Sequence, residues 1–301
     1  MSLVRTFILA LALSGGAAQA QVVVSSKIDT EGGVLGSIIL QVLEEAGIPT
    51  QSRLQLGATP VMRQAITAGE IDLYPEYTGN AAYFFNRAED PVWKDAEGAY
   101  ETARDLDREA NDIVWLAPAP ANNTWGIALR DDVAQEAGVS TLTEFGQWIA
   151  GGGDVKLAAS SEFVNSAAAL PSFQETYGFE LSAAQMVVLS GGDTAATIQA
   201  AANGTSGVNA AMVYGTDGAI PFAGLTVLED DRKVQPVYQP APIIRAAVLE
   251  EHPEIADLLA PVFAELDLET LQTLNGRVQV EGVPAAQVAT DFLAEHGLTG
   301  E

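Results

Sequence analysis

The chain has 301 residues, in which 40 Asp and Glu outnumber 14 Lys and Arg; its formal net charge is −26, and it contains no cysteine. This charge argues against nucleic acid as a partner, because an acidic chain repels the phosphate backbone. Without cysteine, the sequence has no disulfide framework, no thiolate chemistry and no cysteine for a lipid anchor.

The first twenty residues have the pattern of a cleavable secretory signal. Arg5 supplies a basic start, an apolar run occupies residues 7–13, and the small-residue motif AQA ends the segment at residues 18–20. The apolar run is too short to span a bilayer as a helix, and the closing motif suits signal peptidase. We therefore expect a mature chain that begins at Gln21, carries no lipid anchor and is exported to a bacterial periplasm.

About 280 residues remain, enough for one large domain or two modest ones. Their first part alternates strand and helix patterns, with strands predicted at 22–25, 53–56 and 71–74 and helices at 34–46 and 61–68. This alternation predicts a parallel sheet with helices on both faces, in which ligands bind beyond the carboxyl ends of the strands. Tyr77 follows the third strand in a predicted turn, at such an end.

The middle of the chain contains a predicted crossing between two lobes. A polar helical stretch at 88–106 and a strand at 112–116 precede the proline-punctuated passage APAPANNTWGIALR at 117–130. Beyond it we predict helices at 143–149, 170–177 and 194–202, the last capped by residues 191–194, and strands at 156–159 and 186–189. Residues 208–220 are expected to return the chain to the first lobe, and helices at 254–266 and 285–296 complete the sequence.

The common signatures of enzymes are missing or weak. His252 and His296 are the only histidines and both fall in predicted C-terminal helices, so a zinc cluster or a histidine-based triad is hard to assemble. Glycines at 32, 33 and 36 match neither nucleotide-binding motif and indicate a tight turn with close helix packing. Carboxylate pairs leave glycosidase-type chemistry open but unsupported. We expect no catalytic residues, no cofactor and no metal.

Four aromatic side chains at strand ends or beside turn residues suit the binding of an organic cation. A quaternary ammonium group has no N–H to donate, so a protein recognises it by surrounding it with ring faces, each contributing about 0.5–2 kcal/mol. The four candidates are Tyr77, Trp125, Tyr214 and Tyr238. Each alone is compatible with an ordinary half-buried aromatic, but their shared position at predicted lobe junctions favours a cage.

Several motifs resemble those of one family of transport proteins. They are SSKIDTEG, LGATPVMRQAITAGEIDLYPEYTGN, APANNTWGIAL, LAASSEF, GGDTAATIQAAA, AAMVYGTDG and VYQPAPIIR. Over essentially the whole mature chain they are similar to the substrate-binding proteins of glycine betaine/choline/carnitine ABC transporters, most closely the OsmF (YehZ) branch. The resemblance implies an α/β, two-lobed periplasmic-binding-protein type II fold with a ligand cleft between the lobes, which close by hinge bending. We expect the first lobe to comprise residues 21–124 and 219–301, and the second lobe residues 125–218.

The resemblance also implies which residues line the cleft. The family's aromatic cage falls on the four aromatic candidates above. Further polar ligand-binding positions fall on Lys27, Asn80, Asn123 and Ser166.

One position of the implied site departs from the family. Relatives commonly carry Arg and Asp in the segment that here reads EFVNSAAALP, where Ser166 stands at the place of the arginine and Ala168 at the place of the aspartate. The family's arginine clamps the ligand's carboxylate, so its loss is expected to cost a carboxylate ligand about 1.5–3 kcal/mol. A cation without a carboxylate, such as choline, would lose little.

The leading hypothesis is a non-catalytic, monomeric periplasmic receptor that delivers a quaternary ammonium compound, such as choline or glycine betaine, to a membrane ABC permease. An alternative with the same fold is a receptor or sensor for a different small polar metabolite. A third possibility, an exported enzyme, would require a catalytic dyad that the sequence does not reveal.

Other prominent residues are expected to have structural roles. Tyr74 alternates with apolar residues on a strand and is expected to pack, and Glu76 is expected to orient the following turn by accepting backbone N–H groups. Asp193 is expected to cap a helix, Asp217 to lie in a turn or hinge, and Tyr83 to lie in the core.

Overall fold

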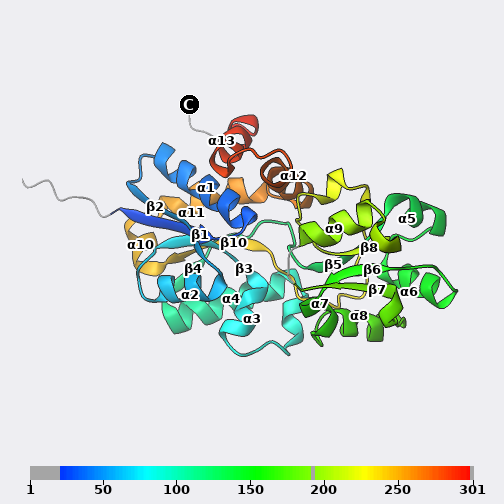
Figure 1. The fold of residues 1–301 in the computed structure, drawn as a ribbon. Helices are drawn as coiled ribbons and strands as arrows, with labels where there is room; N and C mark the ends of the chain where they lie inside the picture. The colour runs from blue at the N-terminus through cyan, green and yellow to red at the C-terminus, as the bar shows by residue number, and fades with distance from the viewer. Residues whose placement is uncertain (1–20, 191–193, 299–301) are drawn as a thin grey trace, which may run out of the picture.

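The computed structural model describes residues 21–190 and 194–298, so the predicted signal segment and the predicted helix cap at Asp193 lie outside the described residues. Two five-stranded sheets lie side by side, each between layers of helices (Figure 1). No helix within the described residues is long and apolar enough to cross a membrane.

The first sheet has the strand order β2-β1-β3-β10-β4. Its strands are β1 (Val22–Lys27), β2 (Thr50–Gly57), β3 (Leu73–Tyr77), β4 (Ile113–Trp115) and β10 (Pro240–Arg245). β1 pairs in parallel with β2 and β3, as predicted, whereas β10 runs antiparallel to β3 and β4. The sheet is therefore mixed rather than wholly parallel.

β3 continues through Tyr77, so the predicted turn at this tyrosine is wrong. Pro75 faces Pro242 across the antiparallel pair, and Tyr77 faces Pro240. In an antiparallel pair of strands, facing residues alternate between positions that hydrogen-bond to the partner strand and positions that do not. Pro240 and Pro242 are two residues apart, so both occupy the same kind of position relative to β3. The carbonyls of Pro240 and Pro242 accept hydrogen bonds from the other side of the strand. The sheet thus accommodates three residues that lack an N–H.

Helices bury both faces of the first sheet. One face packs against α1 (Thr30–Glu45), α11 (Glu254–Ala264), α12 (Leu268–Gln279) and α13 (Ala285–Glu295). The opposite face packs against α2 (Thr59–Thr67), α3 (Ala81–Phe84) and α4 (Ala96–Asn111). The short α10 (Ala246–Glu251) follows β10. Helix α12 was not predicted from the sequence.

The second sheet has the order β7-β6-β8-β5-β9. Its strands are β5 (Trp125–Arg130), β6 (Leu157–Ser160), β7 (Met186–Leu189), β8 (Ala210–Tyr214) and β9 (Leu225–Val227). β6 is parallel to β7 and β8, and β5 is antiparallel to β8 and β9. Because β9 pairs with β5, the second sheet extends beyond the expected lobe boundary at residue 218.

Helices also cover both faces of the second sheet. One face packs against α5 (Asp131–Ala137), α6 (Leu142–Ala150), α7 (Ser161–Asn165) and α8 (Leu170–Tyr177). The other face packs against α9 (Thr194–Ala202).

The two segments that connect the sheets run beside one another. The chain leaves the first sheet between β4 and β5 and returns between β9 and β10. The backbone N–H of Asn123 donates to the carbonyl of Tyr238 at 3.0 Å, and the N–H of Tyr238 donates to Asn122 Oδ1 at 2.8 Å. The hydroxyl of Thr124 donates to the carbonyl of Pro236 at 2.9 Å. These bonds fix two residues of the cleft, Asn123 and Tyr238, relative to each other.

A buried carboxylate holds α4 against the first sheet. Asp107 is fully buried and accepts two hydrogen bonds from the Arg63 guanidinium, at 2.7 and 2.6 Å. It also accepts a bond from Trp115 Nε1 at 2.9 Å. Asp107 is completely shielded from water, and the Arg63 side chain is 14% exposed, so the buried carboxylate depends on the guanidinium for its charge partner.

Removal of this carboxylate is expected to destabilise the protein strongly. We expect Asp107→Ala to lower the free energy of unfolding by about 3–5 kcal/mol, because the Arg63 charge is left without its partner. Asp105→Ala is the matched control on the same helix, since Asp105 is 70% exposed in its ion pair with Arg104; its effect should stay within about 0.5 kcal/mol. Urea unfolding of both variants measures the difference, and equal midpoints would contradict the assignment.

Candidate functional site

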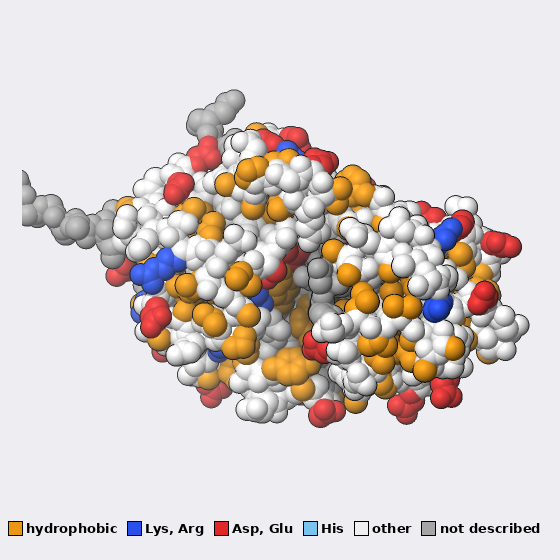
Figure 2. All heavy atoms as spheres, viewed as in Figure 1, with side chains coloured by type: hydrophobic (Ala, Val, Ile, Leu, Met, Phe, Trp, Pro, Cys, Tyr) orange, Lys and Arg blue, Asp and Glu red, His pale blue; other side chains and the backbone are white. Residues whose placement is uncertain are grey.

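A cavity of about 640 Å³ lies between the two sheets, with walls from both. In the space-filling view the surface is hollowed between the two halves of the molecule, with hydrophobic side chains inside (Figure 2). Seven of the eight predicted site residues line the cavity: Lys27, Tyr77, Asn80, Asn123, Trp125, Tyr214 and Tyr238.

Strand pairing places two of the aromatic residues together. Trp125 begins β5 and Tyr214 ends β8, and their Cα atoms are partners in the antiparallel ladder. Side chains at such positions lie on the same face and interact. The two rings stack with centroids 6.2 Å apart and an interplanar angle of 27°.

The other two aromatic residues come from the first sheet. Tyr77 ends β3, and Tyr238 lies two residues before β10, the neighbouring strand. A Cβ atom on Gly79 would lie only 2.7 Å from the Tyr238 ring, so the ring can rest on the backbone only because residue 79 is glycine. Burial raises the pKa of Tyr238, and its phenol stays neutral at neutral pH.

A buried carboxylate organises the polar wall beside Tyr77. Glu76 is fully buried and accepts hydrogen bonds from the Tyr77 N–H at 2.7 Å, Asn80 Nδ2 at 2.7 Å and the Tyr74 hydroxyl at 2.9 Å. It also forms an ion pair with Lys27 Nζ, which lies 4.4 Å from the centroid of the Tyr77 ring. Lys27 and Asn80 are therefore held by Glu76, and the Lys27 charge is already paired.

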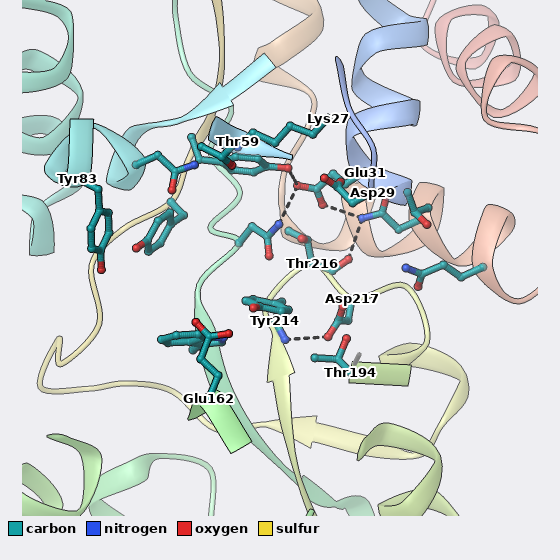
Figure 3. Close-up of a pocket in the computed structure, with 18 residues that line it drawn as sticks. Lys27, Asp29, Glu31, Thr59, Tyr83, Glu162, Thr194, Tyr214, Thr216 and Asp217 are labelled. Carbon is teal, nitrogen blue, oxygen red and sulfur yellow. Dashed lines mark hydrogen bonds between the residues drawn. The ribbon is translucent and has the colours of Figure 1, made fainter. Parts of the chain in front are cut away.

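The structure adds Glu31, which sequence reasoning missed as a site residue. It lies in the first turn of α1 and lines the cavity. Its carboxylate accepts bonds from the Tyr77 hydroxyl at 2.6 Å, Asn123 Nδ2 at 3.2 Å and Asn275 Nδ2 at 2.7 Å, and Figure 3 shows these bonds converging on it. The available signal was its position just after β1, at the carboxyl end of a parallel strand.

Burial changes the titration of Glu31. Desolvation raises the pKa of this carboxyl above its ordinary value, because loss of water disfavours the charged form, while hydrogen bonds from Thr216, Tyr77 and Asn275 oppose the shift. The nearby Asp29 carboxylate adds to the rise. Burial and the Glu31 charge likewise raise the pKa of Tyr77, so its hydroxyl remains a donor.

Ser166 does not line the cavity. It caps the C-terminal end of α7, where its backbone N–H donates to the carbonyl of Glu162 at 2.8 Å. Glu162, in the first turn of the same helix, lines the cavity instead. Ser166, predicted as a polar ligand-binding residue, is therefore the one predicted site residue that is not among those lining this cavity.

The sequence predicted other roles, or no role, for several of the residues that line the cavity. Tyr83, expected in the core, is 57% exposed and lines the cavity. Asp217 also lines it, and its carboxylate accepts the N–H of Tyr214 at 2.7 Å, which fits the expected turn. Tyr74 is fully buried in the core of the first sheet, as expected. The remaining additions are Asp29, Thr30, Thr59, Glu162, Thr194, Thr216, Asn275 and Gln279.

The charges around the cavity favour a cation. Four acidic residues line it, namely Asp29, Glu31, Glu162 and Asp217, and Lys27 is the one lysine or arginine among the described lining residues. No group of three or more His, Asp or Glu in the described part of the chain is placed to hold a metal ion. The described lining residues therefore combine ring faces with acidic groups.

Comparison with known proteins gives consistent matches over nearly the whole chain. Residues 20–295 match the family described as the substrate binding domain of ABC-type glycine betaine transport system. The chain is 55% identical over 282 residues to the glycine betaine-binding protein YehZ of Escherichia coli (strain K12), covering 94% of this chain and 92% of the relative. It is 32% identical over 305 residues to a glycine-betaine-binding protein of Pseudomonas aeruginosa, covering 98% and 95%.

A solved structure shows the same fold. The structure of apo YehZ from Escherichia coli superimposes with a TM-score of 0.87 and covers 93% of this chain and 100% of that chain, at 55% identity. The predicted fold class, a two-lobed α/β fold of periplasmic-binding-protein type II, is confirmed by this match.

The raised pKa of Glu31 predicts the direction in which this residue's contribution to stability changes with pH. The folded state binds the Glu31 proton more tightly than the unfolded state, so this residue contributes most to stability at low pH, and the contribution falls as the pH rises above the ordinary value of 4.5. We expect the difference in unfolding free energy between the wild type and Glu31→Gln to fall as the pH rises. Urea unfolding between about pH 3 and pH 8 measures this difference.

Glu144→Gln provides a control in which the contribution to stability is expected to change with pH in the opposite direction. Hydrogen bonds, first from the backbone of Ser140 and then from its hydroxyl, lower the pKa of Glu144. Its contribution to stability is therefore present above its ordinary value of 4.5 and is lost as the pH falls. A Glu31 difference that is flat with pH, or that rises like the Glu144 difference, would refute a raised pKa.

Proposed function

Because this chain belongs to the family of substrate-binding domains of ABC-type glycine betaine transport systems, we propose that it captures a quaternary ammonium compound in the cavity between its sheets. It is a substrate-binding protein of an ABC transporter and not an enzyme. Proteins of this kind work with membrane permease subunits, and the proposed role of this chain is to deliver the captured ligand to them.

The observation that carries the proposal is the convergence of four aromatic side chains on one cavity. Tyr77 and Tyr238 come from the first sheet, and Trp125 and Tyr214 come from the second. Since a quaternary ammonium group has no donor hydrogen, ring faces and nearby negative charge are the interactions that recognise it. Both are supplied here, and indole provides the strongest of the ring faces.

We further propose that the cavity prefers a cation without a carboxylate, such as choline, to glycine betaine. A ligand carboxylate requires an unpaired cationic partner or well-placed donors. Lys27 is paired with Glu76, and no arginine is among the described residues that line the cavity. The acidic lining residues would oppose a ligand's carboxylate. Glycine betaine, which the names of the relatives specify, is expected to bind more weakly.

The two sheets and their connections suggest how the ligand is enclosed. We propose that each sheet with its helices is one lobe, that the second lobe comprises residues 125–234, and that the paired segments 121–124 and 235–239 form the hinge. The lobes would close over the ligand from both sides. We also propose that the mature protein begins at Gln21 after cleavage of a signal peptide and acts as a periplasmic monomer.

Isothermal titration of residues 21–301 with choline tests the cage. We expect Trp125→Leu to weaken choline binding by about 1–2 kcal/mol, roughly five- to thirtyfold, because a ring face is lost. Trp148→Leu is the control, since Trp148 is also partly buried but packs against the second sheet's core and does not line the cavity. If choline and glycine betaine both fail to bind the wild type, a different polar metabolite becomes the better hypothesis.

The missing arginine can be restored in a second titration. We expect Ser166→Arg to strengthen glycine betaine binding about ten- to a hundredfold, through a charge-assisted bond to the carboxylate, and to leave choline binding no stronger. Asn165→Arg places the same charge on the neighbouring exposed residue and should not reproduce the gain. An equal gain for both ligands, or for both variants, would argue against a carboxylate clamp at this position.

A further inference from the structure

Helix α12 belongs to the first half of the molecule but also contacts the second half. Its residues Leu271 and Leu274 are buried in the core against the first sheet. Another side of the same helix contacts residues 215–222, the segment between β8 and β9, whose Ile220 is buried against the second sheet. In Figure 1 α12 lies at the boundary between the two halves. The helix therefore joins the two proposed lobes, in addition to the segments that connect them along the chain.

Two side chains of α12 donate hydrogen bonds to the backbone of this segment. Gln272 Nε2 donates to the carbonyl of Gly215 at 2.7 Å, and Asn275 Nδ2 donates to the carbonyl of Thr216 at 2.9 Å. Asn275 and Thr216 are buried, so loss of their bond would leave a polar group unsatisfied away from water. These bonds hold the backbone of the second half against α12.

Beside these bonds the two backbones touch at a pair of glycines. A Cβ atom on Gly218 would lie 2.1 Å from the backbone nitrogen of Gly276. A Cβ atom on Gly276 would lie 2.7 Å from the Phe222 ring and 2.8 Å from the carbonyl oxygen of Gly218. Neither glycine has a positive φ, so it is the close approach of the two backbones that requires glycine here. A methyl group at either position would push α12 and the segment apart.

Residues next to this contact line the ligand cavity on both sides. Thr216 and Asp217 directly precede Gly218 in the second half, and Asn275 and Gln279 flank Gly276 on α12. The separation of the two backbones therefore determines the separation of two cavity walls, one from each proposed lobe.

Building on the function proposed above, we infer that the contact between α12 and residues 215–222, here called the α12 junction, sets the relative position of the two lobes and thereby the affinity for the ligand. Gly218 and Gly276 are positioning residues, since neither is among the described residues that line the cavity. A ligand that needs both walls binds with reduced apparent affinity when the lobes spend less time in the arrangement that offers both. The junction thus adjusts affinity without contributing a ligand contact at these two glycines.

The position of the lobes can be measured without any ligand. Because the chain contains no cysteine, two introduced cysteines can carry spin labels, with Glu101→Cys on α4 and Glu136→Cys on α5 at exposed positions of the two halves. We expect Gly276→Ala and Gly218→Ala to shift the distance between the labels in the same direction, as measured by double electron–electron resonance. An unchanged distance in both variants would overturn the inference, whatever the ligand proves to be.

A milder variant covers the case in which the glycine variants do not fold. Gln272→Ala removes the bond to the carbonyl of Gly215 and introduces no clash. It should broaden the distribution of distances between the same two labels, because the lobes are held less firmly. A distribution identical to that of the wild type would count against the junction.

Isothermal titration of residues 21–301 with glycine betaine and with choline measures the consequence for binding. For whichever compound the wild type binds, we expect Gly276→Ala and Gly218→Ala to weaken binding at least about fivefold, because two cavity walls are spread apart. Wild-type affinity in both variants would refute the link between the junction and binding. If the wild type binds neither compound, the proposed function fails, and the label distances still decide whether the junction positions the lobes.

Gly146→Ala is the matched control, because it introduces a similar clash inside one lobe. A Cβ atom on Gly146, in α6, would lie 2.2 Å from the carbonyl oxygen of Tyr177, at the end of α8. We expect this variant to lower the urea unfolding midpoint and to leave both the inter-lobe distance and the affinity unchanged. The same changes in distance and affinity as in Gly276→Ala would show a general effect of strain and would overturn the assignment to the junction.

Discussion

The site depends first on the buried carboxylate of Glu76. A charge placed inside a sheet is tolerated only when it is paired and fully hydrogen-bonded, and Glu76 reaches Lys27 on β1, Tyr74 and Tyr77 on its own strand, and Asn80 just beyond it. The need to satisfy this carboxylate fixes the polar wall of the cavity and holds Lys27 across the Tyr77 ring. It also occupies Lys27, the one lysine among the described residues that line the cavity.

Tyr77 connects this network to the second buried carboxylate, Glu31: its N–H donates to Glu76 and its hydroxyl donates to Glu31. Its ring belongs to the aromatic wall, and its hydroxyl joins Asn123 and Asn275 in satisfying Glu31. Asn275 comes from α12, and through the carbonyl of Thr216 it also contacts the loop after β8 of the second sheet. The cavity is therefore lined by side chains that hold one another in place across both sheets, and ring faces and acidic groups face the same space.

Local sequence patterns predicted much of the fold and little of its polar network. The helix Leu170–Tyr177 and the strand Met186–Leu189 have the predicted bounds, because apolar periodicity and turn residues mark them. β10 was missed because its prolines weaken a strand pattern, although their register in the antiparallel ladder accommodates them. The aromatic and polar positions that line the cavity came from short motifs. Glu31 and Asn275 are 244 residues apart, so no local sequence pattern could predict the hydrogen bond between them.

A crystal structure of the mature protein grown with choline tests the central claim most directly. The account predicts the ammonium group between the ring faces of Tyr77, Trp125, Tyr214 and Tyr238, within about 6 Å of the ring centroids. Choline bound outside this cavity, or inside it with its ammonium group away from these rings, would contradict the claim that the four aromatic residues recognise the cation.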